Sequence, residues 1–480
     1  MKAELSIPEL HGYDVLNATG GILAGGTAEA LFTGVSTDSR QISQGSLFIP
    51  LIGERFDGHD FIAAAVKEGA SGFLIQKGYE NKIREKFADA TAISVDDTLN
   101  ALGDIAHFWR KKFRVAVVAI TGSSGKTTTK EMFAGISGLK KKIIKAQGNY
   151  NNLVGLPMTV LQINAQHELA ILEMGANIRG EIGRLTDIAE PDIGLITNIG
   201  PAHLEGFESI ETVREEKLDL FRRMPDAGVA IINLDDEKLL VTDKDWRGKR
   251  VTFGFRKNAD VSAEGIEMKG MEGVVFTIKM DSFRQEITLP IAGNHNVYNA
   301  LAAAASSWAL GIDFHTICQG LTAFQPISGR MEIHRLKNGA FIINDTYNAN
   351  PASFGEALKT LKDLKGNHKS TVIMGDMLEL GDQAEVMHEG IGSLMADTGV
   401  HTIYLRGRLS PATAAGALKR NMPKGRIIFF ETPDEIMDRL ASHMKRGDWI
   451  LVKGSRQTRM EQAVEKIIEA FGIEESGGKK

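Results

Sequence analysis

The sequence predicts an α/β protein of three domains. A smaller N-terminal α/β domain is expected over residues 1–110, a central domain with a doubly wound sheet and a phosphate-binding loop over 111–326, and a C-terminal Rossmann-like α/β domain over 327–480. A chain of 480 residues is too long for one hydrophobic core. In two separate parts of the chain, apolar runs of strand length alternate with helical stretches, which is typical of parallel sheets covered by helices.

The N-terminal region contains short strand-like runs at residues 46–51 and 72–75. A helical stretch separates them at 61–69, and a second helix is expected from about 97 to 110. This region therefore predicts a small α/β unit.

The central region begins with a continuous apolar, β-branched run at 115–120, which is typical of a buried parallel strand. Similar runs predict strands at 169–174, 193–197 and 229–233. Residues 250–291 alternate between apolar and polar and predict antiparallel strands, and an alanine-rich helix is expected at 296–310.

The C-terminal region begins after residues 325–330, where Pro, Ser and Gly occur close together and predict a hinge. Beyond the hinge, strand-like runs again alternate with helical stretches. The predicted strands are 341–345, 371–376, 402–407, 427–430 and 449–454. The pattern predicts a second parallel α/β sheet.

The composition is that of an ordinary globular protein, with 43% apolar and 24% charged residues. The formal net charge of -5 argues against a general nucleic-acid or membrane-surface binder, which needs a basic field. Cys318 is the single cysteine, so no intrachain disulfide forms, and it is predicted to be a small core residue. Because neither a signal peptide nor an apolar run of about 18 residues is present, we expect no membrane insertion and a cytoplasmic location.

Residues 120–129, ITGSSGKTTT, lie between a predicted buried strand and a helix, which is the context of a phosphate-binding loop. Its backbone N–H groups and the helix dipole attract phosphate oxygens. Lys126 is expected to reach the β- and γ-phosphates, and Thr127 to hold Mg²⁺. The motif departs from GxxxxGK[ST], because Ile120 occupies the position of the first glycine. The candidate ATP-binding residues of this loop are Gly122, Ser123, Ser124, Gly125, Lys126, Thr127 and Thr128.

The loop alone does not define the reaction, since kinases, ATPases, GTPases and ligases share it. No NKxD sequence of the GTPase type is present, so ATP is the expected nucleotide.

Glu173 and His203 follow the next predicted strands, at the edge where ligands of open α/β sheets bind. Together they suit a second divalent ion. A capping or salt-bridge role for Glu173 and an ordinary loop position for His203 are the alternatives, and Lys217 taken alone reads as a solvated lysine.

Several motifs together resemble the Mur ligases, and among these the member that adds a dipeptide. They are TGSSGKTTTKEM (121–132), GNYNNLVGLP (148–157), LEMGANIRGEI (172–182), TNIGPAHLEGF (197–207), AGNHNVYNALAA (292–303), NDTYNANPAS (344–353) and MGDMLELG (374–381). The resemblance implies that the N-terminal domain holds the UDP-muramoyl end of the substrate, the central domain ATP, and that the C-terminal domain closes over both. A monomer is expected.

The resemblance also implies roles for individual residues. Lys126, Glu173, His203 and Lys217 would form the catalytic set, with Lys217 carbamylated by CO₂ and joining Thr127, Glu173 and His203 as a metal ligand. Further ATP-binding residues would be Asn294, His295, Asn299, Arg330 and Asp345. Substrate-binding residues would be Ser36, Asp38, Ser39, Arg40, Gly58, His59, Asp60, Asn149, Asn152, Tyr347, Asn348 and Asn350. Ordinary turn chemistry is the alternative for residues 36–40 and 53–60, and backbone hydrogen bonding for Asn348 and Asn350.

The implied reaction joins the terminal carboxylate of UDP-N-acetylmuramoyl-tripeptide to the amine of D-alanyl-D-alanine, with ATP and two Mg²⁺ ions. The alternatives are a sister ligase that adds a single amino acid, a folate polyglutamate ligase, and an ATP-binding switch without ligation. The diaminopimelate-adding sister usually carries a DNPR sequence, which this chain lacks. The sequence does not distinguish lysine from diaminopimelate in the tripeptide.

Overall fold

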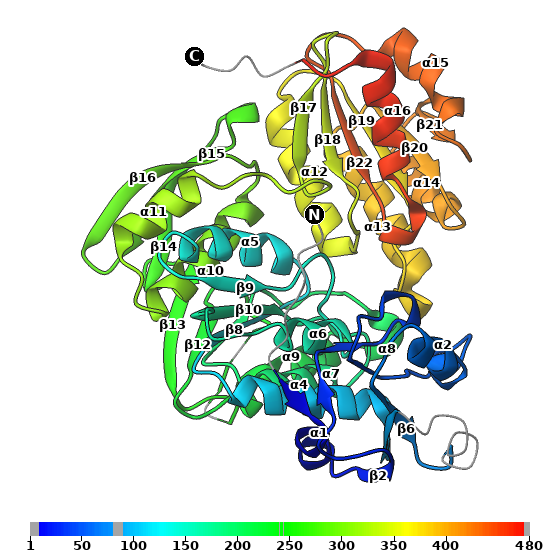
Figure 1. The fold of residues 1–480 in the computed structure, drawn as a ribbon. Coiled ribbons are helices and arrows are strands. Elements are labelled where there is room, and N and C mark those ends of the chain that lie inside the picture. The colour runs from blue at the N-terminus through cyan, green and yellow to red at the C-terminus, as the bar shows by residue number, and fades with distance from the viewer. Residues whose placement is uncertain (1–8, 80–89, 240, 243, 475–480) are drawn as a thin grey trace.

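The computed structural model describes residues 9–79, 90–239, 241, 242 and 244–474. Three larger sheets, each within one of the predicted ranges 1–110, 111–326 and 327–480, confirm the three-part α/β architecture. The finer boundaries stay a proposal. In Figure 1 the N-terminal part is blue, the central part runs from cyan to green, and the C-terminal part runs from yellow to red above it. None of the helices in the described ranges has the length and apolar character that crossing a membrane requires.

The N-terminal part has a five-stranded sheet of order β2-β7-β6-β5-β4 and a small β1–β3 pair. The strands are β1 (Leu10–His11), β2 (Ile22–Gly25), β3 (Leu31–Phe32), β4 (Gly34–Ser36), β5 (Ser46–Phe48), β6 (Gly72–Gln76) and β7 (Thr91–Val95). The helices are α1 (Gly12–Thr19), α2 (Ile62–Lys67) and α4 (Thr98–Lys111). The α4 helix, whose Asp97 side chain caps its start, lies against the central part: the indole N–H of Trp109 donates to the carbonyl oxygen of Ile163 at 2.9 Å.

The central sheet has nine strands in the order β16-β15-β14-β13-β12-β11-β8-β10-β9. The strands are β8 (Ala116–Thr121), β9 (Ile143–Lys145), β10 (Leu169–Glu173), β11 (Ile193–Ile196), β12 (Val229–Asn233), β13 (Lys249–Gly254), β14 (Val261–Met268), β15 (Val274–Met280) and β16 (Phe283–Leu289). The helices are α5 (Lys126–Ser137), α6 (Gly155–Val160), α7 (Glu181–Ala189), α8 (Leu204–Phe207), α9 (Ile210–Arg223), α10 (Asn294–Ala309) and α11 (Phe314–Thr322).

Both faces of the central sheet are buried, as the continuous apolar runs predict. Val118 and Ile120 of β8 pack in one core with residues of α5 and α10, and Val117 and Ala119 pack on the other face with residues of α4, α7 and α9. The antiparallel prediction for 250–291 is confirmed for the β14–β15 and β15–β16 pairs but is wrong for β13, which runs parallel to β12 and β14. The first two residues of β13 are exposed, so its polar start reflects solvent rather than an antiparallel partner.

The C-terminal sheet has the order β17-β18-β22-β19-β20-β21, in which β17 alone is antiparallel to its neighbour. The strands are β17 (Glu332–Arg335), β18 (Phe341–Asp345), β19 (Ser370–Gly375), β20 (Thr402–Arg406), β21 (Ile427–Phe429) and β22 (Trp449–Lys453). The helices are α12 (Pro351–Lys365), α13 (Ala384–Asp397), α14 (Ser410–Lys419), α15 (Asp434–His443) and α16 (Glu461–Phe471). All five predicted strands are present.

Candidate active site

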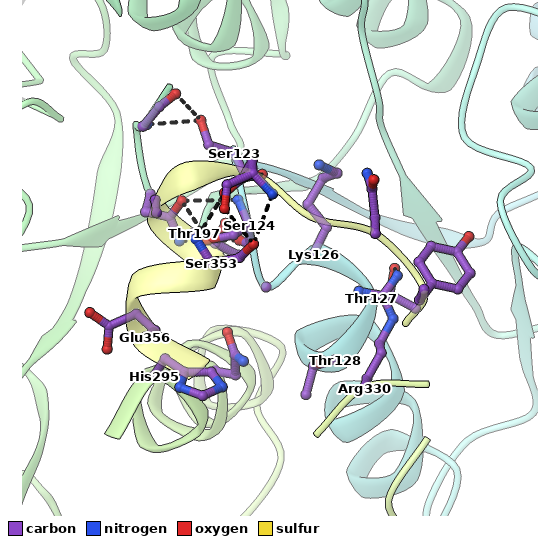
Figure 2. Close-up of a pocket in the computed structure, with 18 of the residues that line it drawn as sticks. Ser123, Ser124, Lys126, Thr127, Thr128, Thr197, His295, Arg330, Ser353 and Glu356 are labelled. Carbon is purple, nitrogen blue, oxygen red and sulfur yellow. Dashed lines mark hydrogen bonds between the residues drawn. The ribbon is translucent and has the colours of Figure 1, made fainter. Parts of the chain in front are cut away.

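A cavity of about 1130 Å³ lies between the phosphate loop, the start of α10 and the first loops of the C-terminal part. Figure 2 shows side chains from these segments converging on it. The predicted residues that line it are Ser123, Ser124, Gly125, Lys126, Thr127, Thr128, Asn149, Asn152, Glu173, His203, His295, Asn299, Arg330, Asp345, Tyr347, Asn348 and Asn350. Gly122, Asn294, Lys217 and the seven predicted residues of the N-terminal part do not line it.

The two glycines of the phosphate loop are required by different neighbours. Gly122 has φ +146°, and a Cβ there would lie 1.8 Å from the hydroxyl oxygen of Thr197. Gly125 has φ +80°, and its Cβ would lie 2.3 Å from Oδ1 of Asn299. Since both contacts are far below van der Waals distance, any larger residue would displace the loop.

The segment that follows β11 holds the phosphate loop in place through hydrogen bonds. The hydroxyl of Thr197 donates to the carbonyl oxygen of Ser124 at 2.6 Å, and Oδ1 of Asn198 accepts from the Ser124 N–H at 3.0 Å. The hydroxyl of Ser123 donates to the carbonyl oxygen of Gly200 at 2.9 Å. Sequence reasoning missed Thr197 and Asn198, although their position after the strand beside β8 was a usable signal.

Lys126 and Thr127 begin α5 and face the cavity (Figure 2). The ammonium group of Lys126 donates to the carbonyl oxygen of Gly122 at 2.7 Å. Burial lowers the pKa of Lys126, and nearby Arg330 acts in the same direction, whereas Glu173 opposes it. The Thr127 hydroxyl donates to Oε2 of Glu173 at 2.9 Å and accepts from the Arg330 guanidinium at 2.9 Å. An arginine from the hinge and a carboxylate from β10 thus meet at one threonine.

Glu173 is buried at the end of β10, where two hydrogen-bond donors and one cation surround its carboxylate. Besides Thr127, the side-chain amide of Asn151 donates to Oε1 at 2.9 Å, and the ammonium nitrogen of Lys130 lies 3.8 Å from Oε2. Lys130 is 1% exposed and also donates to the carbonyl oxygen of Ala146 at 3.0 Å. Sequence reasoning missed Asn151 and Lys130, although Lys130 lies one helical turn after Lys126 and so shares its side of α5.

Lys217 of α9 is 2% exposed, so the solvated-lysine alternative is wrong. Its ammonium group makes no hydrogen bond or ion pair to another residue of the described part of the chain. The adjacent Glu216 carboxylate instead accepts from the N–H groups of Gly180 and Ile182, both at 2.7 Å. Burial, reinforced by the charge of Lys126, lowers the pKa of Lys217 to about 7. The uncharged amine, which is the form that reacts with CO₂, is then well populated near neutral pH.

His203 precedes α8 and has a left-handed backbone, with φ +53°. Its Nδ1 lies 2.6 Å from Oε2 of Glu379 in the C-terminal part. Within the described ranges, no three His, Cys, Asp or Glu side chains converge as a metal site. Thr127, Glu173 and His203 line one cavity and offer a hydroxyl, a carboxylate and an imidazole, whereas Lys217 does not line it. This donor set fits Mg²⁺.

The start of α10 places His295 and Asn299 in the cavity, whereas Asn294 is exposed outside it. Nδ1 of His295 is buried and has no hydrogen-bond partner among the described residues, and burial lowers the pKa of this imidazole. Sequence reasoning missed Tyr298, one helical turn along. Its ring stacks on Phe255 at 4.0 Å between centroids and its hydroxyl donates to Asp235 at 2.9 Å.

The cationic side chains of Arg330 and Lys453 line the cavity from the C-terminal part. The Arg330 guanidinium lies 4.0 Å above the Tyr347 ring, and its Nε is buried without a hydrogen-bond partner in the described residues. Lys453, which sequence reasoning missed, donates to Asp345 at 2.5 Å and to the carbonyl oxygen of Asn348 at 3.0 Å. Lys453 is 2% exposed, so this ion pair is shielded from water.

Asn348 and Asn350 use their side-chain oxygens locally, which confirms the backbone-bonding alternative for these atoms. Oδ1 of Asn348 accepts from the Ala349 N–H at 2.9 Å, and Oδ1 of Asn350 accepts from the Ser353 N–H at 2.8 Å, capping α12. The Asn350 amide also donates across the cavity to the carbonyl oxygen of Ser123 at 3.4 Å. On the opposite wall, Oδ1 of Asn152 accepts from the Gly155 N–H at 2.8 Å, while Asn149 is exposed.

The predicted residues of the N-terminal part lie in loops outside the cavity. Asp38 accepts from the Arg40 side chain at 2.8 and 2.9 Å, and this pairing lowers the pKa of Asp38 to about 2. Ser36 donates to the Asp38 carbonyl oxygen at 3.0 Å, and Ser39 begins a short helix.

The second N-terminal loop is held by a buried histidine. Nδ1 of His59 lies 2.6 Å from Asp57, and Nε2 accepts from the Gln76 N–H at 3.0 Å. The adjacent Gly58 leaves no room for a Cβ, which would lie 2.5 Å from the Leu51 nitrogen, whereas Asp60 is exposed. Turn chemistry therefore accounts for the polar atoms of Asp38 and His59, and these two residues shape the loops from within.

Known proteins match the chain over all three parts. The Mur ligase family catalytic domain matches residues 31–110, the Mur ligase middle domain 120–307, and the glutamate ligase domain of Mur ligases 329–456. The UDP-N-acetylmuramoyl-tripeptide--D-alanyl-D-alanine ligase of Bacillus subtilis is 36% identical over 442 residues, 92% of this chain and 94% of the relative. A crystal structure of MurF from Acinetobacter baumannii superposes with a TM-score of 0.88 at 31% identity and covers 97% of this chain and 100% of its own.

The MurF ligase of Thermotoga maritima, solved in complex with ADP, is 28% identical with a TM-score of 0.79 and covers 91% of this chain and 97% of its own. The matched family domains contain the phosphate loop, the carboxylate at the end of β10, the buried lysine of α9 and the hinge arginine. From its sequence, its three-part fold and the cavity between its last two parts, the chain belongs to the Mur ligase family.

Proposed function

We propose that the protein is an ATP-dependent ligase that joins D-alanyl-D-alanine to UDP-N-acetylmuramoyl-tripeptide in peptidoglycan precursor synthesis. The relatives with this name are similar over nine-tenths or more of the chain, as in Bacillus subtilis and Escherichia coli. The Thermotoga relative binds ADP, which supports ATP as the nucleotide of this chain. Both substrates are small molecules.

The observation that carries the proposal is the meeting of Lys126, Glu173 and Arg330 at Thr127. Two cations and one carboxylate from three separate segments surround the start of α5, where a triphosphate would gain from both the helix dipole and the charges. A phosphoryl group is transferred by positioning and charge neutralisation rather than by covalent help from the protein. The side chains that line the cavity supply both the positioning and the charge neutralisation.

The proposed reaction has two steps. A carboxylate oxygen of the tripeptide attacks the γ-phosphorus of ATP, the bond to the β-phosphate oxygen breaks, and ADP leaves an acyl phosphate. The uncharged amine of the dipeptide then attacks the acyl carbon, loses a proton, and expels inorganic phosphate to give the amide. Lys126 and Arg330 would stabilise the phosphate charge in the first step. The C-terminal part, which contacts the loop through Arg330 and Asn350, would keep water from the acyl phosphate.

The roles of the metal ligands also belong to the proposal. Thr127 would hold one Mg²⁺, and Glu173, His203 and carbamylated Lys217 a second. When bound, these ions would neutralise charge on the transferred phosphoryl group. The buried position of Lys217 and its lowered pKa support the carbamate.

One assay tests the function: phosphate release from ATP with UDP-N-acetylmuramoyl-tripeptide, with and without D-alanyl-D-alanine. We expect release to depend on the dipeptide and on the tripeptide. Release that needs a single amino acid instead would indicate a sister ligase, and release without any amine would indicate a switch. Tripeptides ending in lysine and in diaminopimelate, assayed side by side, identify the third residue.

A further inference from the structure

A contact between His203 and Glu379 crosses the cavity between the central and C-terminal parts. His203 lies before α8, and Glu379 lies in the loop between β19 and α13. Nδ1 of His203 is buried, makes no hydrogen bond of standard geometry to a described residue, and lies 2.6 Å from Oε2 of Glu379. Beside it, the backbone N–H of Glu205 donates to the carbonyl oxygen of Glu379 at 3.2 Å. In Figure 1 the segment before α13 extends down to α8, away from the rest of the C-terminal part.

The backbones at His203 and at Glu379 both have unusual conformations where the two loops meet. His203 has φ +53° and Glu379 has φ +63°, a left-handed conformation that few residues other than glycine adopt. Two residues further, Gly381 has φ +55°, and a Cβ there would lie 3.2 Å from Cα of Glu205. Unfavourable conformations of this kind persist where the surrounding structure imposes them, and they concentrate at functional sites. The two loops are therefore formed to meet at this point.

A lone pair on Nδ1 would repel the carboxylate oxygen at this distance, so a neutral His203 beside Glu379 is expected to carry its hydrogen on Nδ1. The lone pair of a neutral imidazole is then on Nε2, which is the atom left for the cavity that His203 lines. A carboxylate bound to the far nitrogen fixes both the tautomer and the orientation of a metal-binding histidine.

We propose that Glu379 is a positioning residue for His203, and that it acts only when the C-terminal part lies against the central part. The inference rests on the proposed function, in which His203 holds a metal ion. Because the two residues belong to different parts of the chain, the orientation of the imidazole depends on the approach of these parts. Closure would then complete the metal site as well as exclude water.

The test measures metal binding rather than turnover. Mn²⁺ is titrated into the full chain saturated with ADP, and free Mn²⁺ is followed by electron paramagnetic resonance. Glu379→Ala should weaken the His203-dependent Mn²⁺ binding by about 10-fold or more, the range found for partners of metal-bound histidines. Glu379→Gln, whose amide oxygen can accept from Nδ1–H, should lose less. The matched control is Asp382→Ala, which removes an exposed carboxylate from the same loop.

A second measurement reads the tautomer directly. Nitrogen-15 histidine spectra of the metal-free protein, assigned with His203→Asn, should show hydrogen on Nδ1 in the wild type and in Asp382→Ala. In Glu379→Ala, the signal should shift toward a mixture of tautomers. Glu379→Gln retains the size of the side chain, so it keeps the comparison valid if the alanine variant does not fold.

Equal Mn²⁺ affinity and equal tautomer signals in Glu379→Ala and Asp382→Ala would overturn the inference. This outcome is distinct from failure of the proposed function, which is judged on the wild type by dipeptide-dependent phosphate release. A wild type that ligates normally, with Glu379→Ala indistinguishable from the control, would remove Glu379 and leave the ligase intact.

Discussion

Carbamate formation on Lys217 should increase as the pH rises through neutrality, because only the uncharged amine attacks CO₂. Burial lowers the pKa of Lys217 to about 7, so about half of this side chain is uncharged at pH 7 and about nine-tenths at pH 8. A solvated lysine with a pKa near 10.4 is uncharged in only about 0.04% of molecules at pH 7. The buried lysine thus gains roughly 1000-fold in reactive amine over surface lysines at the same pH.

The assay is carbon-13 NMR of the full chain in labelled bicarbonate, with dissolved CO₂ held constant between pH 6 and 9. We expect one carbamate signal with its midpoint near pH 7 in the wild type. The signal should be absent from Lys217→Ala and unchanged in Lys362→Ala, which removes an exposed lysine of α12. A signal that survives Lys217→Ala, or that appears only above about pH 9 as for a solvated lysine, would refute the reasoning from burial.

Four further variants and one control test the loop, its supporting charges and the N-terminal site. Lys126→Ala should lower dipeptide-dependent phosphate release by more than about 100-fold, the scale of a lost preorganised charge; near-normal release would exclude the loop from catalysis. Gly122→Ala should abolish ADP binding in calorimetry, since its Cβ would lie 1.8 Å from the hydroxyl oxygen of Thr197. The control Gly135→Ala, whose Cβ meets no atom within 4 Å, should retain ADP binding and leave the protein as stable as the wild type or slightly more stable. Lys130→Met should lower the free energy of unfolding in urea by about 3 kcal/mol, because it removes a buried cation from beside the Glu173 carboxylate and a donor from the Ala146 carbonyl oxygen; an unchanged midpoint would show that the pairing is unimportant. His59→Ala should raise the KM for the UDP-linked substrate by about 10-fold with little change in kcat, the size of one or two lost buried hydrogen bonds, and an equal fall in kcat would contradict a role confined to binding.

The sequence predicted the parallel strands well because each is buried on both faces and so reads as an unbroken apolar run. The strands β8, β10 and β11 begin and end within about two residues of the predicted positions. Prediction of strand direction failed at β13, since a polar strand start at the exposed side of a sheet has the same alternating pattern as an antiparallel strand. The local pattern of apolar and polar residues indicates which residues of a strand are buried, but it does not indicate which strand lies beside it or in which direction that strand runs.

The candidate site was predicted where its residues belong to contiguous motifs and was missed where they meet only in three dimensions. The phosphate loop was found because Gly125, Lys126 and Thr127 are adjacent in sequence. The partner of Asp345 was missed because Lys453 is 108 positions away. Lys217 looked solvated in its charged helical segment, yet α9 packs against the sheet and buries it. Which side of a charged helix faces a core is a property of the whole fold.

Charge balance links the modification of Lys217 to the phosphate loop. As cations, Lys126 and Lys217 repel each other, since the charge of Lys126 contributes to the lowered pKa of Lys217. Burial and the charge of Arg330 also lower the pKa of Lys126, so the unmodified site works against the positive charge that a triphosphate needs. A carbamate would replace this repulsion with attraction, because Lys217 would then carry a negative charge. The modification would therefore favour the charged form of Lys126 in addition to supplying a metal ligand, and each change would favour the other.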